Sequence, residues 1–284
     1  MRRDRGNVAR EAVTGVARPV WLPVVAAAFA AAAGCDAGET KELGADFPAA
    51  SCEMTPSDGP NGLDPFYEKY LDASGIPVLA SAAVSDQAVK TACMIVVRMV
   101  SLRDDVRRAM IDQQMRVAIL GVNERTTDMP EYRNLYQMFP GQEWDALRGV
   151  GATLMIPVSS VGEENLLCLQ DDIFAGERLL VQTFATAVLL GVDAADSNFD
   201  SRLRASYDAA MNAGLWRNTY AAANEIEYYA EGVQSWFDAN PDVSPPDGTH
   251  NDINTRAELR AYDPTLAGLV AETMPDDSWR PKCP

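Results

Sequence analysis

The sequence of 284 residues predicts an α+β domain in which helices dominate and the sheet is small. Three observations predict this fold class. Most of the periodic segments place apolar residues three and four positions apart, as on one face of a helix. Only two short apolar runs resemble strands. A composition of 47% apolar and 23% charged residues is typical of a folded protein with a core.

Seven segments are expected to be helical, because a capping residue, helical spacing or a terminal Gly or Pro marks each of them. These helices are expected at residues 85–100, 103–114, 177–190, 200–213, 224–238, 255–262 and 264–274. Gly191 and Gly214 are expected to end the third and the fourth helix. Strands are expected at residues 116–121 and 154–158, and Pro157 would place the second strand at an edge of the sheet.

Charge divides the chain into two unequal parts. Residues 1–34 carry a net charge of +3, and the remaining 250 residues carry 19 − 39 = −20. A body this acidic does not bind nucleic acid by neutralising phosphates, and it is not attracted to anionic lipid. We therefore expect no nucleic-acid partner, and contact with a membrane only through a lipid anchor.

The N-terminus resembles the signal peptide of a bacterial lipoprotein. An Arg-rich start is followed by an uncharged stretch from Pro19 to Gly34, which is shorter than the roughly 20 residues of a membrane span. Small residues directly before Cys35 resemble the lipobox, at which Cys35 would become the lipidated first residue. The alternative is an ordinary signal peptide, with Cys35 in a disulfide.

Three parts of the chain follow from this interpretation. Residues 1–34 are expected to be a signal peptide, residues 35–62 a flexible tether, and residues 63–284 a single domain. The protein is therefore expected to be exported and anchored to a bacterial membrane, in the periplasm or at the cell surface.

The five cysteines agree with export. If Cys35 is lipidated, four remain, and an oxidising compartment favours two disulfides among them. These four are Cys52, Cys93, Cys168 and Cys283, and their pairing is left open. Cys93 lies in an apolar helical run, so that a buried free thiol is its alternative.

Two segments in the second half of the chain carry a resemblance to a known family. Residues 177–187 read Glu-Arg-Leu-Leu-Val-Gln-Thr-Phe-Ala-Thr-Ala, and residues 219–232 read Thr-Tyr-Ala-Ala-Ala-Asn-Glu-Ile-Glu-Tyr-Tyr-Ala-Glu-Gly. Their layout resembles the lethal-factor-like group of the zincin metallopeptidases. That group has His-Glu-Phe-x-His on one helix and Glu-aromatic-aromatic-Ala-Glu on a later one, with a Tyr seven residues before the first Glu. The resemblance implies a zincin-like domain, with a zinc ion between the two helices.

The first of these motifs is degenerate, because residues 182–186 read Gln-Thr-Phe-Ala-Thr. Gln182 stands at the position of the first zinc-binding His, Thr183 at that of the general base, and Thr186 at that of the second His. A neutral amide or hydroxyl does not hold Zn²⁺ as imidazole does, and Thr183 cannot act as a base near neutral pH.

The second motif keeps its pattern. Glu227 stands at the position of the third zinc ligand, and Tyr220 stands at that of the residue expected to stabilise an oxyanion. Glu231 follows one helical turn later. Gln182 and Thr186 are also one turn apart, and we expect them to face Glu227.

The resemblance therefore implies a pseudopeptidase, for which we expect no catalytic residue, metal or cofactor. Its cleft is expected to bind an extended peptide or protein along an edge of the sheet. Two alternatives stay open. One is an active metallohydrolase that holds zinc with Glu227, Glu231 and His250, the only histidine of the chain. The other is a structural surface lipoprotein without a ligand.

Each candidate residue also has a plain structural explanation. Glu227 would complete a capping box with Asn224. Tyr220 would be a packing residue with a satisfied hydroxyl, and Glu231 would lie on a polar face of its helix. His250 would be solvated in a polar loop.

Overall fold

Four strands form the sheet in residues 52–54 and 62–284, the part of the chain that the computed structural model describes. They are β1 (Lys69–Ala73), β2 (Ile76–Ala80), β3 (Arg116–Leu120) and β4 (Val158–Gly162), in the order β1-β2-β3-β4. β1 and β2 are antiparallel, whereas β2, β3 and β4 are parallel. The expected signal peptide, Cys35 and most of the expected tether lie outside the described residues.

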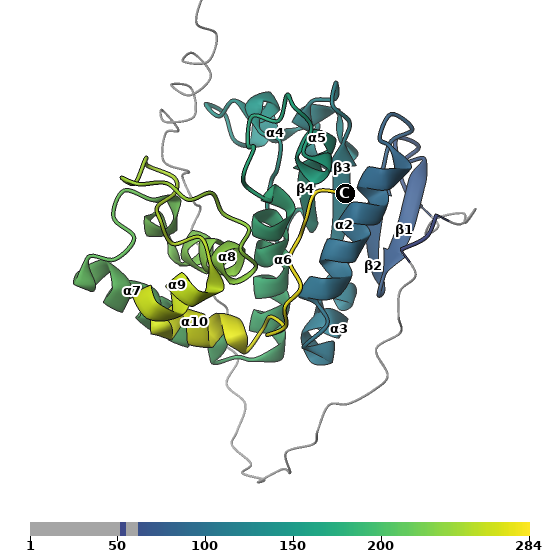
Figure 1. Cartoon of the computed structure of the whole chain (residues 1–284). Coiled ribbons are helices and arrows are strands. Elements are labelled where there is room, and N and C mark those ends of the chain that lie inside the picture. The colour runs from purple at the N-terminus through teal and green to yellow at the C-terminus, as the bar shows by residue number, and fades with distance from the viewer. Residues whose placement is uncertain (1–51, 55–61) are drawn as a thin grey trace, which may run out of the picture. The chain divides into compact units, whose positions relative to one another are not determined.

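Helices make up most of the remaining elements, so the predicted α+β class with dominant helices and a small sheet is confirmed. The α-helices are α2 (Asp86–Met99), α3 (Asp104–Asp112), α4 (Leu135–Met138), α5 (Glu163–Leu167), α6 (Leu179–Ala195), α7 (Phe199–Ala213), α8 (Glu225–Trp236), α9 (Arg256–Tyr262) and α10 (Pro264–Ala271). Four short 3₁₀ turns are Thr126–Asp128, Pro130–Tyr132, Trp144–Ala146 and Tyr220–Ala222. Figure 1 shows α6 in the middle, between the sheet with α2 and α3 on one side and helices α7 to α10 on the other.

The helix α6 continues through Gly191, which was expected to end it. A Cβ atom at this position would lie 2.5 Å from the Met110 Cγ atom and 3.0 Å from the Val106 carbonyl oxygen of α3. The absent side chain therefore lets the two helices pack closely. Gly214 does end its helix, because its φ of 77° is a left-handed conformation that favours glycine.

The strand expected at residues 154–158 is displaced towards the C-terminus. Leu154 and Met155 are 67% and 71% exposed and lie in a turn that the Thr153 amide closes by donating to the Ile156 carbonyl. The fully buried strand that follows, β4, reads Val-Ser-Ser-Val-Gly, and its two serines concealed it in the sequence. The β1–β2 hairpin was also missed.

Two disulfides are present, as expected. They join Cys52 to Cys93 and Cys168 to Cys283. The alternative of a free thiol at Cys93 is therefore wrong. Such bonds persist in an oxidising compartment, which agrees with a location outside the cytosol.

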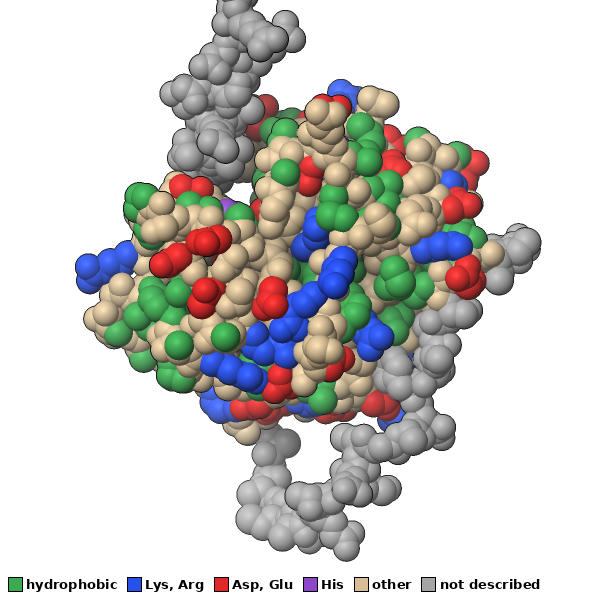
Figure 2. Space-filling model, viewed as in Figure 1, with side chains coloured by type: hydrophobic (Ala, Val, Ile, Leu, Met, Phe, Trp, Pro, Cys, Tyr) green, Lys and Arg blue, Asp and Glu red, His purple; other side chains and the backbone are tan. Residues whose placement is uncertain are grey.

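The surface carries both signs of charge. Figure 2 shows Arg and Lys side chains across the middle of one face, with Asp and Glu side chains beside them. Several arginines of α9 and of the C-terminal segment are ion-paired: Arg256 and Arg260 with Asp276, and Arg280 with Asp238. These cations are therefore already paired with the protein's own carboxylates.

Candidate functional site

The two motif helices pack against each other in the structure. The start of α8 is fixed by Asn224, whose side-chain oxygen accepts hydrogen bonds of 2.9 Å from the amides of Ile226 and Glu227. This cap orients the first turn, so that Glu227 and Glu231 follow on one helix face. The site lies where this face meets α6.

Glu227 is bound by the tyrosine that the family pattern places seven residues before it. The Tyr220 hydroxyl donates a 3.0 Å hydrogen bond to Glu227 Oε1. Burial raises the pKa of Glu227 to about 7, and this hydrogen bond only partly opposes the rise. Burial, together with the nearby carboxylate, also raises the pKa of Tyr220. The Glu227 carboxylate is therefore engaged by Tyr220 and does not close the capping box.

Glu231, which is 2% exposed, is the carboxylate that meets α6. Gln182 Nε2 donates to Glu231 Oε1 at 3.2 Å, and Asn240 Nδ2 donates to Oε2 at 3.2 Å. Burial, with Glu177 and Glu227 nearby, raises the pKa of Glu231 to about 8, against the opposing effect of His250. Gln182, which was expected to face Glu227, therefore bonds to Glu231, the neighbouring carboxyl group one turn later on α8.

Neither threonine of the degenerate motif offers a free reactive group. The Thr183 hydroxyl donates to the Ser160 carbonyl at 3.0 Å, and the Ser159 hydroxyl donates to the Thr183 carbonyl at 2.6 Å. The Thr186 hydroxyl turns back along its own helix and donates to the Thr183 carbonyl at 2.8 Å. Both hydroxyls are thus used in holding α6 against β4 and in local helix structure.

Residues 148–153, which belong to no strand, lie beside β4 and on α6. Val150 accepts from the Ser160 amide at 2.9 Å and donates to the Ser160 hydroxyl at 3.0 Å. A Cβ atom at Gly151 would lie 2.6 Å from Thr186 Oγ1, and one at Gly149 would lie 3.1 Å from Thr183 Cγ2. The two glycines therefore let the segment approach the helix at Thr183 and Thr186.

One interpretation of the sequence expected His250 to be solvated. In the structure its side chain is only 11% exposed, so this interpretation is wrong. Its Nε2 atom lies 3.5 Å from Glu177 Oε2, and its Nδ1 atom lies 3.9 Å from Glu231 Oε2. Burial alone would lower the pKa of His250, but Glu177, Glu231 and Asp247 outweigh burial and raise it. Asp247 also shapes the loop by accepting from the His250 amide at 2.9 Å.

Glu177 is a member of the site to which the sequence gave no role. It lies two residues before α6, is 6% exposed, and accepts a 3.0 Å hydrogen bond from Gln234 Nε2. Its contact with His250 depends on a loop that is distant in sequence. The only local signal was a carboxylate at the start of an apolar helix, which is also typical of an ordinary helix N-terminus.

Zinc, the metal that the resemblance implies, does not fit the residues present. The amide of Gln182 and the hydroxyl of Thr186 are neutral and already hydrogen-bonded. Within residues 52–54 and 62–284, no three His, Cys, Asp or Glu side chains are arranged to hold a metal ion. The alternative set of zinc ligands, Glu227, Glu231 and His250, is not gathered around one point. His250 lies beside Glu231, whereas Glu227 is bound by Tyr220.

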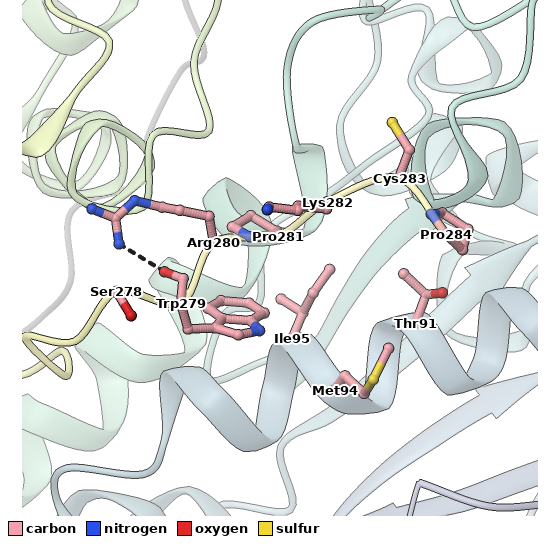
Figure 3. Close-up of a pocket in the computed structure, with 10 residues that line it drawn as sticks. All are labelled: Thr91, Met94, Ile95, Ser278, Trp279, Arg280, Pro281, Lys282, Cys283 and Pro284. Atoms are coloured by element: carbon pink, nitrogen blue, oxygen red, sulfur yellow. Dashed lines mark hydrogen bonds between the residues drawn. The ribbon is translucent and has the colours of Figure 1, made fainter.

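A pocket of about 430 Å³ lies elsewhere, between α2 and the C-terminal segment (Figure 3). Met94, Ile95, Trp279 and Pro281 are among its lining residues. None of the motif residues lines it, so it is separate from the candidate site.

Among the described residues, no helix is both long and apolar enough to cross a membrane.

The chain was compared with known proteins and with solved structures. No family model matches the sequence, and no curated protein does. Among solved structures, the chain is similar to the Pro-Pro endopeptidase of Paenibacillus alvei, with 16% sequence identity and a TM-score of 0.44. The match covers 69% of this chain and 96% of that one. At this identity and TM-score the similarity says nothing about activity.

Proposed function

We propose that the protein is an exported lipoprotein with a zincin-like domain that has lost peptidase catalysis and acts by binding. The observation that carries the proposal is the state of the first motif. Gln182 donates to Glu231, and Thr183 donates to a backbone carbonyl, so neither position holds a metal ligand or a base. General-base catalysis typically contributes about 10²–10⁴-fold to a rate, and Thr183 supplies none of it.

The proposed ligand is an extended peptide or protein segment along residues 148–153. Val150 directs its amide and carbonyl towards β4. Backbone groups alternate in an extended segment, so we infer that the neighbouring Gly149 and Gly151 direct theirs to the opposite side. Both glycines are half-buried, so a peptide could add there as a further strand.

The cysteines support the proposed lipid anchor. The two disulfides use Cys52, Cys93, Cys168 and Cys283, which leaves the fifth cysteine, Cys35, without a partner among the other four. Cys35 directly follows the small residues that resemble a lipobox. A lipidated Cys35 would attach the domain to a bacterial membrane, in the periplasm or at the cell surface.

The test uses the purified mature protein. We expect elemental analysis to find no stoichiometric zinc, and a peptide array to retain the protein without chelator-sensitive cleavage. About one zinc per chain, with cleavage that a chelator abolishes, would instead establish the metallohydrolase. Failure to bind any peptide or protein segment would favour the structural surface lipoprotein.

A further inference from the structure

A group of polar side chains, most of them buried, lies around Glu231 and differs from the site of an active zincin. We call it the acceptor cluster. It consists of Glu177, Glu227, Glu231, Gln234, Asn240 and His250. Glu227, Glu231 and Gln234 belong to α8, and Glu177 lies two residues before α6. Asn240 and His250 lie in the loop that follows α8.

Acidic side chains outnumber basic ones in the acceptor cluster. It contains three carboxyl groups and a single imidazole. Among the residues that the structure describes, the only ion pairs of Glu177 and Glu231 are with His250, and Glu227 has none. Carboxylates removed from water need a counter-charge, a proton or several donors, and His250 alone cannot serve all three.

Two buried amide oxygens in the cluster lack a donor. Gln234 is 0% exposed and Asn240 is 8% exposed, and no hydrogen bond reaches Gln234 Oε1 or Asn240 Oδ1 in the described part of the chain. Both amides belong to the cluster through their nitrogens, which donate to Glu177 and Glu231. Buried polar atoms are nearly always partnered, so unpartnered acceptors here indicate a missing donor.

The candidate site includes partly exposed groups as well as buried ones. Gln182, Tyr220 and Glu227 are each partly exposed, whereas Glu231 and Gln234 are buried. Glu227 is therefore the carboxyl group of the cluster that a slender group from the solvent would meet first. A primary ammonium is compact, carries one positive charge and has three N–H donors.

We propose that the acceptor cluster receives an ammonium group of the bound partner, either a lysine side chain or the N-terminal amine of a peptide. This inference rests on the proposed function, because it assumes that the cleft binds a peptide. The ammonium supplies the donors that Gln234 Oε1 and Asn240 Oδ1 lack, and a counter-charge for the carboxyl groups when they are ionised. It stands near the Glu227 position, where an active zincin has its metal.

Calorimetry on the wild-type mature protein tests the proposal with a peptide that the array retains. Replacing each lysine of that peptide in turn by norleucine, and acetylating its amine, identifies the group used. We expect one of these changes to weaken binding by about tenfold or more, as expected for the loss of a charge-assisted hydrogen bond. Glu227→Gln should weaken the unmodified peptide similarly and the modified peptide little. Glu225→Gln is the matched control, because Glu225 pairs with Arg204 instead.

The outcomes separate the two proposals. Equal binding of the unmodified, norleucine and acetylated peptides would refute the ammonium proposal and leave peptide binding intact. If no peptide binds, the proposed function fails, and methylammonium chloride then tests the cluster alone. We expect it to raise the melting temperature of the wild type above that in sodium chloride of equal ionic strength, and to do so less in Glu227→Gln. Stabilisation by a divalent metal but not by methylammonium would also overturn the proposal.

Discussion

The side-chain amide of Gln182 donates a 3.2 Å hydrogen bond to Glu231 across the interface of α6 and α8. A neutral donor thus joins the two motif helices, at a place where the family is expected to have a charged metal. Because Glu231 is buried, this bond stabilises the fold as well as marking the lost site.

Removal of this donor should cost stability. Gln182→Ala leaves Glu231 with Asn240 as its remaining amide donor, and we expect the free energy of unfolding to fall by about 1–3 kcal/mol. Urea denaturation at pH 7 measures it. Gln137→Ala, in the short helix α4 far from this interface in sequence, is a control. An unchanged value for Gln182→Ala would show that this bond contributes nothing.

The stability of the protein should fall as the pH rises from about 5 to about 8. Folding raises the pKa of Glu227 from 4.5 to about 7 and that of Glu231 from 4.5 to about 8, so the folded state binds more protons in this window. His250, whose pKa is also raised, adds to the effect, because its favourable charge is lost as the pH passes the folded-state pKa.

The slope of the free energy of unfolding against pH measures this effect by urea denaturation. Each unit of pKa shift corresponds to about 1.4 kcal/mol. The double variant Glu227→Gln, Glu231→Gln should flatten the slope, and Glu225→Gln should not. A wild-type protein that gains stability between pH 5 and pH 8 would contradict the burial of uncharged carboxyl groups.

Restoring the first motif tests the position of Glu227. The triple variant Gln182→His, Thr183→Glu, Thr186→His should bind zinc, and zinc at about 100 times its Kd should stabilise it by about 2.7 kcal/mol. Thermal melting with and without zinc shows the shift. The same triple variant with Glu227→Gln is the control, and its melting temperature should rise much less with zinc. If the triple variant folds but binds no zinc at high micromolar metal, Glu227 is not at the ligand position.

A double-mutant cycle tests the contact between Gly151 and Thr186 of α6. Gly151→Ala would place its Cβ 2.6 Å from Thr186 Oγ1, and we expect a destabilisation of about 1–3 kcal/mol. Thr186→Ala should relieve part of this cost, so the two changes should be non-additive. Gly268→Ala is the control, because nothing lies within 4 Å of its added Cβ in α10. Additive effects would show that the segment does not press on Thr186.

The mature protein should contain two disulfides and no disulfide of Cys35. Each disulfide removes two hydrogens, so the mass before reduction should be about four mass units lower than after it. Peptide mapping without reduction should find Cys52 with Cys93 and Cys168 with Cys283. A cross-link that contains Cys35 would end the proposal of lipidation.

Local signals in the sequence were sufficient for some elements and not for others. Gly214 ends α7 because its backbone is left-handed, which a glycine after a periodic run indicates. Gly191 carries the same local signal but serves a contact with α3, and only tertiary packing separates the two cases. The β1–β2 hairpin was missed although Ser74-Gly75 is a turn dipeptide, and both residues have positive φ.

In the candidate site, too, the sequence indicated one contact and not another. The pairing of Tyr220 with Glu227 follows a spacing within one chain segment, and the motif indicated it. The position of His250 depends on how a loop folds back onto Glu177, 73 residues earlier in the chain by 250 − 177. No local pattern encodes that contact, which explains why His250 was assigned to solvent and Glu177 was given no role.

The disulfide between Cys52 and Cys93 also sets the reach of a domain anchored at Cys35, as proposed above. From Cys35 to Cys52 the chain has 52 − 35 = 17 steps, whereas the whole tether expected from the sequence, up to residue 63, has 28 steps. At about 3.4 Å per residue, the greatest reach is roughly 58 Å with the bond and roughly 95 Å without it. Because the effective concentration of a tethered domain falls roughly as the −3/2 power of the tether length, the bond raises the concentration of the domain near the membrane by roughly twofold. A membrane-bound partner would therefore meet this domain more often while the bond is intact.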